Sequence, residues 1–409
     1  MSCDANLKAL SVTEALSKLL ATVPAFDATE KVELGSALGR VLADNLISDI
    51  NVPPADNSAM DGYAVNTKSL AGNGYCLPIS QRVAAGYSPE RLTPGSAARI
   101  FTGAEVPEGA DAVVMQEQCT EEGEKILFPE NVKRGQNIRR CGQDIRSGAE
   151  ILTKGIRLQP QHLGLIASIG IRYVPVFRRL KVAVLSTGDE LLEPGEQNVP
   201  GKIYNSNRYA LSGLIGALGM EFVDLGIVED TEQATEAALQ QAATEADCII
   251  TSGGVSVGEE DHVKPAIERL GKLDLWKVAI KPGKPIAFGE VLGVPLIGLP
   301  GNPVSAFVTF CLFARPFLLK YQQVNNILPR SVSFKADFEI KNWSIRTEYL
   351  RAQLLTGDSG ETLVRIFENQ SSGVLTSTCW AHGFAVVPPE ATINRGENIE
   401  FLHYAELLN

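Results

Sequence analysis

Histidine and paired cysteine are scarce in this sequence, which excludes the commonest transition-metal sites. The four histidines lie far apart and form no HExxH motif, so a structural zinc site is not expected. The seven cysteines are odd in number and never form CxxC, which indicates reduced thiols and a cytoplasmic protein. If a metal acts here, oxygen ligands and a hard ion such as Mg²⁺ are the better expectation.

An excess of positive charge is also missing. The chain has 37 Lys and Arg against 48 Asp and Glu, a net charge of −11, so no overall field attracts nucleic acid or an anionic membrane. Its apolar run over residues 306–314 ends at Arg315 and Pro316, short of the roughly 20 residues that cross a bilayer. We therefore expect neither nucleic acid nor a membrane as a partner. Any anionic ligand must be bound by a local site.

The usual nucleotide-binding loops are absent as well. No GxxxxGK[ST] occurs anywhere, and no GxGxxG follows the apolar strand that begins near Leu180. A P-loop kinase and a Rossmann dehydrogenase are both disfavoured.

The chain is too long for one ordinary core, and its pattern changes along its length. A capping box at Ser11 predicts an early helix. Short β-branched runs broken by Gly, Pro and Asn then predict an inserted β-rich domain. The predicted domains are a segmented helical or linker domain over 1–51 and 148–177, the β-rich insert over 52–147, an α/β domain over 178–325, and a C-terminal β-barrel over 326–409.

Apolar strands and amphipathic helices alternate regularly from Leu180 onward. KVAVLST, EFVDLGIV and DCIITS have the continuous apolar character of buried parallel strands, and the segments between them have helical spacing. The pattern predicts a central doubly wound, mostly parallel sheet with helices on both faces, within a multidomain α/β plus β protein. In such sheets ligands sit beyond the carboxyl ends of the strands.

Three lysines stand among apolar residues in LWKVAIKPGKPIAF, residues 275–288. If residues 275–281 form a β-strand, Trp276, Val278 and Ile280 enter a core. Lys277, Ala279 and Lys281 then share the other face. The Pro-Gly turn that follows would bring Lys284 to the same side. One interpretation is a cationic ledge for a ligand. The other is a solvated strand edge whose lysines prevent pairing with another strand.

Polar or glycine-rich loops follow the strands of this α/β region. Glu190, Asp230 and Asp261 follow the first three strands and offer carboxylates. The glycine pair at 253–254 would let the backbone approach a phosphate, and the PGNP segment at 300–303 opens a helix whose free N–H groups attract an anion. Charges of both signs at the same edge of the sheet favour a ligand site. The alternative is that these are ordinary solvated loop residues.

Two stretches of the predicted insert also carry ligand groups. NVPPADNSAMDGYAV offers Asp61 in a turn-forming run, which is explained either by turn hydrogen bonding or by an acidic ligand group. RGQNIRRCGQDIRSG places Arg139, Arg140 and Asp144 in a glycine-punctuated loop, either as a solvated charge run or as a phosphate clamp.

GGVSVG also matches the nucleophile elbow G-x-S-x-G, with Ser256 at its centre. A catalytic triad needs an acid and a histidine on later loops, but His262 is too close in sequence. His382 and His403 belong to the C-terminal β region. A phosphate-cradling turn is therefore favoured over hydrolase catalysis, and both interpretations stay open.

Seven ordered motifs resemble the molybdopterin molybdenumtransferase family, which includes the gephyrin E domain. They are NSAMDGYAV, FTGAEVPEGADAVVMQE, RRCGQDI, STGDEL, SGGVSVGEED, IKPGKP and GLPGNPVSA. The resemblance implies an enzyme that inserts molybdate into adenylylated molybdopterin and releases AMP, with Mg²⁺ involved. It also implies a homodimer of four-domain subunits whose active site lies in a cleft shared between the subunits, and other proteins of the same biosynthetic pathway as partners.

The resemblance assigns site residues by motif. Those expected to be catalytic are Asp61, Thr102, Asp144, Glu190, Asp230, Asp261, Lys277 and Lys281, of which Glu190, Asp230 and Asp261 are the candidate metal ligands. Those expected to bind substrate are Arg139, Gly253, Gly254, Ser256, Lys284, Pro300, Asn302, Pro303, Ser305, Arg351 and Ser372. A noncatalytic pterin-binding or scaffold module and a hydrolase that uses Ser256 are the alternatives.

Overall fold

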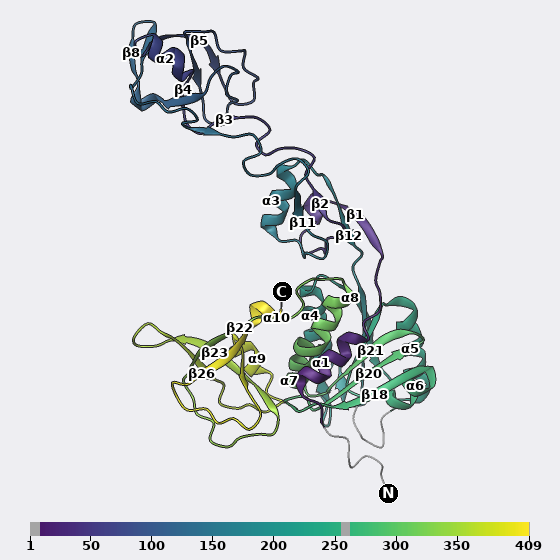
Figure 1. Ribbon diagram of the computed structural model, residues 1–409. Coiled ribbons are helices and arrows are strands. Elements are labelled where there is room, and N and C mark those ends of the chain that lie inside the picture. The colour runs from purple at the N-terminus through teal and green to yellow at the C-terminus, as the bar shows by residue number, and fades with distance from the viewer. Residues whose placement is uncertain (1–8, 255–261, 409) are drawn as a thin grey trace.

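The computed structural model describes residues 9–254 and 262–408, and it shows an elongated chain of several parts (Figure 1). Two of the predicted site residues, Ser256 and Asp261, lie outside the described residues. The predicted class, a central α/β domain accompanied by a β-rich insert, a segmented part and a C-terminal barrel, is confirmed.

The α/β domain is built on one six-stranded sheet in the order β16-β13-β17-β21-β20-β18. The first four of these strands are parallel, and β20 runs antiparallel to both of its neighbours. Strand β18 therefore points the same way as β21. The strands are β13 (Lys181–Thr187), β16 (Glu221–Val228), β17 (Cys248–Ser252), β18 (Gly271–Lys277), β20 (Pro285–Val291) and β21 (Val294–Leu299).

Helices cover both faces of this sheet, as the alternating pattern predicts. One face packs on α5 (Glu232–Glu245) and α6 (Val263–Leu270). The other packs on α4 (Ser206–Ala217) and on a long helix that follows β21. Local capping starts two of these helices, because the side chain of Asn205 accepts from the Arg208 N–H and that of Thr231 accepts from the Ala234 N–H.

The long helix comprises α7 (Pro303–Thr309), a π-helical turn (Phe310–Ala314) and α8 (Arg315–Tyr321). By length and composition alone, the segment Pro303–Tyr321 could cross a membrane, but 89% of its apolar window is buried inside the protein. It serves as the central helix of the largest hydrophobic core.

The expected strand over 275–281 is split into two. Strand β18 ends at Lys277, and β19 (Ile280–Lys281) pairs with the C-terminal sheet instead. Between them, Val278 bridges to Leu10 near the start of the described chain. The change of partner explains the break, while Val278 and Ile280 are still fully buried as the alternation predicts.

The C-terminal part is a closed β-barrel, because β23 pairs with both β24 and β25 and so completes the circle β23-β24-β22-β26-β25. Its elements are β22 (Ser331–Ala336), β23 (Thr347–Thr356), β24 (Thr362–Ile366), α9 (Thr376–Trp380), β25 (Gly383–Val387), β26 (Asn398–His403) and α10 (Tyr404–Leu407). Strand β19 adds to the outside of this barrel and joins it to the α/β domain.

The β-rich insert contains a six-stranded sheet in the order β7-β4-β6-β5-β9-β8 and lies at the opposite end of the molecule from the barrel (Figure 1). Its elements are β3 (Asn57–Ser58), β4 (Gly62–Val65), α2 (Thr67–Gly72), β5 (Cys76–Val83), β6 (Ala97–Ile100), β7 (Ala112–Met115), a 3₁₀ turn (Gln116–Gln118), β8 (Thr120–Glu122), β9 (Lys125–Leu127) and β10 (Ile138–Arg139).

The segments on either side of the insert pair with each other, β1 with β12 and β2 with β11. We propose that this pairing defines one segmented domain, with boundaries near residues 51, 147 and 177. Helix α1 departs from it, because Ala15 and Leu19 pack into the α/β core. The elements are α1 (Val12–Ala21), which has the predicted capping box, β1 (Thr29–Glu33), a 3₁₀ turn (Leu34–Ser36), β2 (Leu46–Ile47), β11 (Glu150–Leu152), α3 (Pro160–Ser168) and β12 (Tyr173–Phe177).

Candidate active site

A cavity of about 410 Å³ opens where the carboxyl edge of the α/β sheet meets the C-terminal barrel. Loops after β17 and β21, the turn between β19 and β20, and two segments of the barrel form its walls. The lining residues are Gly253, Gly254, Lys281, Pro282, Gly283, Lys284, Pro285, Pro300, Gly301, Asn302, Ser305, Arg346, Gln370, Ser371 and Ser372.

Distant stretches of the sequence therefore meet at this cavity, as the strand order requires. The residues proposed from sequence that line it are Gly253, Gly254, Lys281, Lys284, Pro300, Asn302, Ser305 and Ser372. Pro303 follows directly as the first residue of α7. Lys281 and Lys284 therefore lie at a cavity, as the interpretation of a cationic ledge for a ligand requires, whereas Lys277 is not part of the lining.

The lining carries positive charge. Lys281, Lys284 and Arg346 contribute three cations, and none of the described lining residues is an aspartate or a glutamate. Within the described part of the chain, the ammonium group of Lys284 and the guanidinium group of Arg346 have no hydrogen-bond or ion-pair partner. Lys281 pairs with Glu348, which lies outside the lining. Three cations around a cavity whose described lining has no carboxylate make it a site for an anion.

Backbone groups complete the walls. Gly253 and Gly254 have φ angles of +92° and +67°, which glycine adopts without strain. A Cβ on Gly254 would lie 2.3 Å from Cγ2 of Val263 in α6, so no larger residue fits there. The loop therefore presents bare backbone to the cavity, where N–H groups can donate to an oxyanion.

The start of α7 is tied to the barrel. The Val304 N–H donates to the Ser372 carbonyl over 3.1 Å, and the side chain of Asn302 does not cap the helix. Ser305, in the first turn, is almost fully buried and yet lines the cavity. The first turn of this helix thus presents a hydroxyl group to a prospective anion.

Arg351 does not line the cavity. Its side chain is 0% exposed, with Nε donating to Ser377 Oγ at 3.0 Å and an Nη atom donating to the Ser371 carbonyl at 3.2 Å. Burial lowers the pKa of the guanidinium to about 10. Because Ser371 and Gln370 are lining residues bonded to Arg351, this arginine supports the cavity wall from behind.

Three family profiles match the chain in order. They are "MoeA N-terminal region (domain I and II)" over residues 10–170, "Probable molybdopterin binding domain" over 183–320, and "MoeA C-terminal region (domain IV)" over 334–404. A molybdopterin molybdenumtransferase of Haemophilus influenzae is 41% identical over 403 residues, which cover 98% of this chain and 100% of the relative.

The chain belongs to the molybdopterin molybdenumtransferase family. A second family member, from Nostoc, is 34% identical and covers 95% of this chain and 92% of its own length. A crystal structure of a molybdopterin biosynthesis moeA protein from Pyrococcus horikoshii OT3 superimposes with a TM-score of 0.83 at 31% identity. It covers 97% of this chain and 100% of that one.

Two of the candidate metal ligands of this molybdenumtransferase family member, Glu190 and Asp230, lie on the same sheet edge but outside the cavity lining. Glu190 follows β13 and Asp230 follows β16, and these neighbouring strands pair as far as Thr187 and Val228. Both residues therefore lie in loops that follow adjacent strand ends. Among residues 9–254 and 262–408, no three His, Cys, Asp or Glu side chains group closely enough to hold a metal ion.

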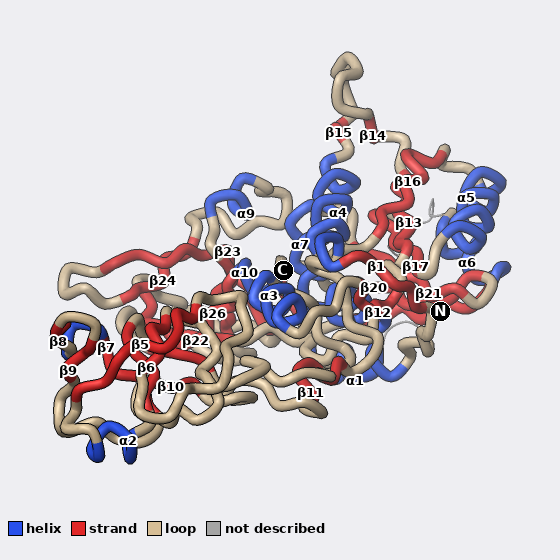
Figure 2. Tube along the Cα trace, turned by 90° about the horizontal axis from the view of Figure 1, so that it is seen from above, coloured by secondary structure: helices blue, strands red, loops and turns tan. Residues whose placement is uncertain are grey.

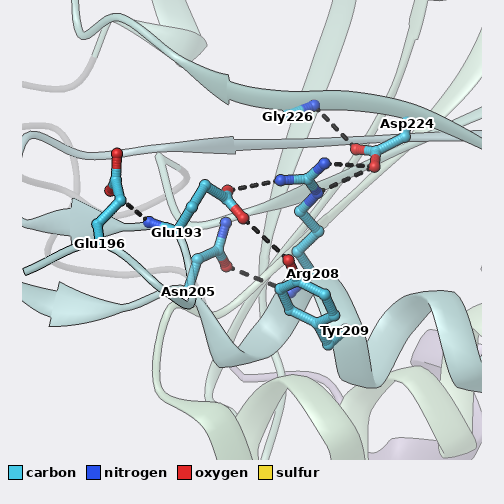
Figure 3. Close-up of polar contacts among 7 residues, drawn as sticks. All are labelled: Glu193, Glu196, Asn205, Arg208, Tyr209, Asp224 and Gly226. Atoms are coloured by element: carbon cyan, nitrogen blue, oxygen red, sulfur yellow. Dashed lines mark hydrogen bonds and ion pairs between the residues drawn. The ribbon is translucent and has the colours of Figure 1, made fainter.

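A polar network fixes the arch that carries Glu190 (Figure 3). The arch runs over residues 188–205 and contains the short strands β14 (Leu191–Leu192) and β15 (Ile203–Tyr204). From α4, Arg208 pairs with Glu193 of the arch at 2.5 Å and with Asp224 of β16. The Tyr209 hydroxyl donates to the same glutamate at 3.1 Å. The network anchors the base of a segment that projects from the molecule in Figure 2.

Asn207, which was not predicted from the sequence, connects two loops of the cavity. Its Nδ2 donates to Ser252 Oγ at 2.8 Å and to the Gly301 carbonyl at 2.7 Å. It is the second residue of α4, in the run NSNRY, and an asparagine in the first turn of a helix gives no local signal of this role. Only the order of the strands brings these three segments together.

The predicted residues of the insert form two groups far from the cavity (Figure 1). Asp61 Oδ1 accepts from both the N–H and the hydroxyl of Thr102, at 2.7 and 2.8 Å, and the backbone bond holds the pKa of Asp61 below its usual range. Asp144 lines a separate surface cavity of about 520 Å³ together with Arg140, and Arg139 lies on β10 beside β3. Within one subunit, neither group reaches Lys281.

Proposed function

We propose that this protein transfers molybdenum from molybdate to adenylylated molybdopterin and releases AMP. The names of its relatives, molybdopterin molybdenumtransferases, support the transfer of molybdenum to molybdopterin. The observation that carries the proposal is the cavity, whose described lining combines three cations and four glycines with no carboxylate. Molybdate, a phosphoanhydride and a phosphate are all anions of the kind that such a lining binds.

The side chains of Lys281, Lys284 and Arg346 would hold the oxyanion by charge-assisted hydrogen bonds, with the Ser305 hydroxyl as a further donor. Breaking the phosphoanhydride adds one water across the P–O bond and frees AMP. The two dithiolene thiols then bind molybdenum and replace one oxide ligand of molybdate, which leaves as water with the two thiol protons. The cations stabilise the negative charge that develops on the leaving phosphate.

Glu190 and Asp230 are ligands of the type that Mg²⁺ prefers, because both offer carboxylate oxygens from adjacent strand ends. Asp261, the third candidate, lies outside the described residues. When bound, Mg²⁺ would neutralise part of the negative charge of the phosphate groups. Glu190 and Asp230 would hold the ion at the sheet edge and so orient the substrate.

We propose that the active form is a homodimer, because the insert's candidate residues lie at the far end of the molecule from the cavity (Figure 1). Asp61, Thr102, Arg139 and Asp144 would then complete the site of the partner subunit. We also propose a cytoplasmic protein that exchanges substrates with other enzymes of molybdenum cofactor synthesis.

The alternatives are not favoured. For the hydrolase, Ser256 lies outside the described residues, and three of the four histidines use Nδ1 to accept a backbone N–H rather than to pair with an acid. They are His162, His382 and His403. A purely noncatalytic scaffold would bind the pterin but release no AMP.

The test uses Lys281→Ala and Asp230→Ala with Lys272→Ala as the matched control, since Lys272 is an exposed lysine at the start of β18. We expect both site variants to remain folded but to release no AMP and load no molybdenum at physiological molybdate. The control is expected to match the wild type. Full activity in both site variants would refute the assignment, and loss of activity in Ser256→Ala alone would favour the hydrolase.

A further inference from the structure

We propose that Glu348 is a positioning residue that holds Lys281 ready for the oxyanion, an inference that rests on the function proposed above. Glu348 does not line the cavity and belongs to β23 of the barrel. It would act on the ligand only through the lysine.

Lys281 contacts both carboxylate oxygens of Glu348. Lys281 Nζ lies 3.1 Å from one carboxylate oxygen of Glu348 and 3.2 Å from the other. The glutamate side chain is only 12% exposed, whereas that of Lys281 is 47% exposed. Among the residues that the structure describes, Nζ has no other partner. The fixed carboxylate is therefore the anchor and the lysine is the group that it orients.

Backbone pairing sets this geometry. In the short parallel ladder between β19 and β23, Lys281 is the register partner of Glu348, and Ile280 is that of Thr347. The Thr347 N–H also donates to the Ala279 carbonyl at 2.9 Å. Arg346, another cation of the lining, precedes this ladder directly. One strand pairing thus places two of the three cations and joins the α/β domain to the barrel.

The physical benefit is preorganisation. A lysine side chain loses up to about 2 kcal/mol of rotamer entropy when it is fixed, and this cost would otherwise fall on ligand binding. The carboxylate also offsets part of the lysine charge, which opposes anion binding. The two effects separate in two variants, because Glu348→Gln removes the charge and keeps an acceptor oxygen, whereas Glu348→Ala removes both.

The experiment measures molybdate affinity by isothermal titration calorimetry for the wild type, Glu348→Gln and Glu348→Ala. We expect Glu348→Ala to bind molybdate about tenfold more weakly than Glu348→Gln, the size of effect that ordering one lysine gives. The same pair is then compared in a Lys281→Ala background, where the difference should vanish if Glu348 acts through the lysine.

Equal molybdate affinity of the Gln and Ala variants would overturn the inference, as would a difference that persists without Lys281. If Glu348→Ala fails to fold, Glu348→Asp replaces it, because the shorter carboxylate keeps the charge but withdraws from Nζ, and it should also bind more weakly than Glu348→Gln. Failure of the wild type to bind molybdate would instead contradict the proposed function, and this inference with it.

Discussion

Arg346 and Arg351 lie five residues apart in the sequence and have opposite surroundings. The sequence resemblance selected Arg351, but the structure places Arg346 in the cavity wall and buries Arg351 behind it. Arg351 lies within β23, whereas Arg346 directly precedes it. Strand β23 was not predicted from the sequence. Which arginine faces a ligand is decided by tertiary structure.

Substituting the two arginines should have different consequences. Arg346→Ala is expected to raise the molybdate KM at least about tenfold with little change in unfolding, because it removes a partly exposed charged donor that has no partner within the described residues. Arg351→Ala should lower the free energy of unfolding by about 2–4 kcal/mol, since it leaves buried acceptors without donors. Steady-state kinetics and urea denaturation measure the two effects. Equal loss of stability in both variants would contradict the distinction.

At the scale of elements, most helices and strands of the α/β domain could be predicted from periodicity and capping. The exceptions have two causes. The 275–281 strand is divided because its second half pairs with the barrel, and the two-residue strands of the arch are too short to give a period. A contact between domains, which a local pattern does not contain, decides the first case, whereas the two arch strands pair with each other.

The glycine loop after β17 offers a test at this scale. Gly254→Ala should reduce molybdate binding and activity at least about tenfold, because its φ is positive and a Cβ would collide with Val263. The matched control is Gly213→Ala in α4, where a Cβ meets nothing within 4 Å and helix propensity should add up to about 1 kcal/mol of stability. Wild-type activity in Gly254→Ala would show that the loop's shape is not required.

At the scale of the whole molecule, the candidate groups are divided between two ends. The cavity lies between the α/β domain and the barrel, and the Asp61–Thr102 pair and Asp144 lie in the insert. The sequence motifs indicated the members of both groups, but no pattern within one chain shows that they must meet. Their separation in the structure is what favours a site shared by two subunits.

A shared site predicts complementation. Lys281→Ala and Asp144→Ala homodimers should each be inactive, whereas a mixed dimer has one site free of both substitutions and should regain roughly half of the wild-type activity. Co-expression with two affinity tags isolates the mixed dimer for an AMP-release assay. Mixing two Lys281→Ala chains with different tags is the control. An inactive mixed dimer would place each site within one subunit.

The central claim is that the 410 Å³ cavity is the oxyanion site. Anomalous diffraction from crystals soaked in molybdate tests it most directly, because molybdenum is located without reference to the protein atoms. We predict a peak among Lys281, Lys284 and Arg346 that disappears in Lys281→Ala crystals. A molybdenum peak elsewhere on the protein, with this cavity empty at saturating molybdate, would contradict the account.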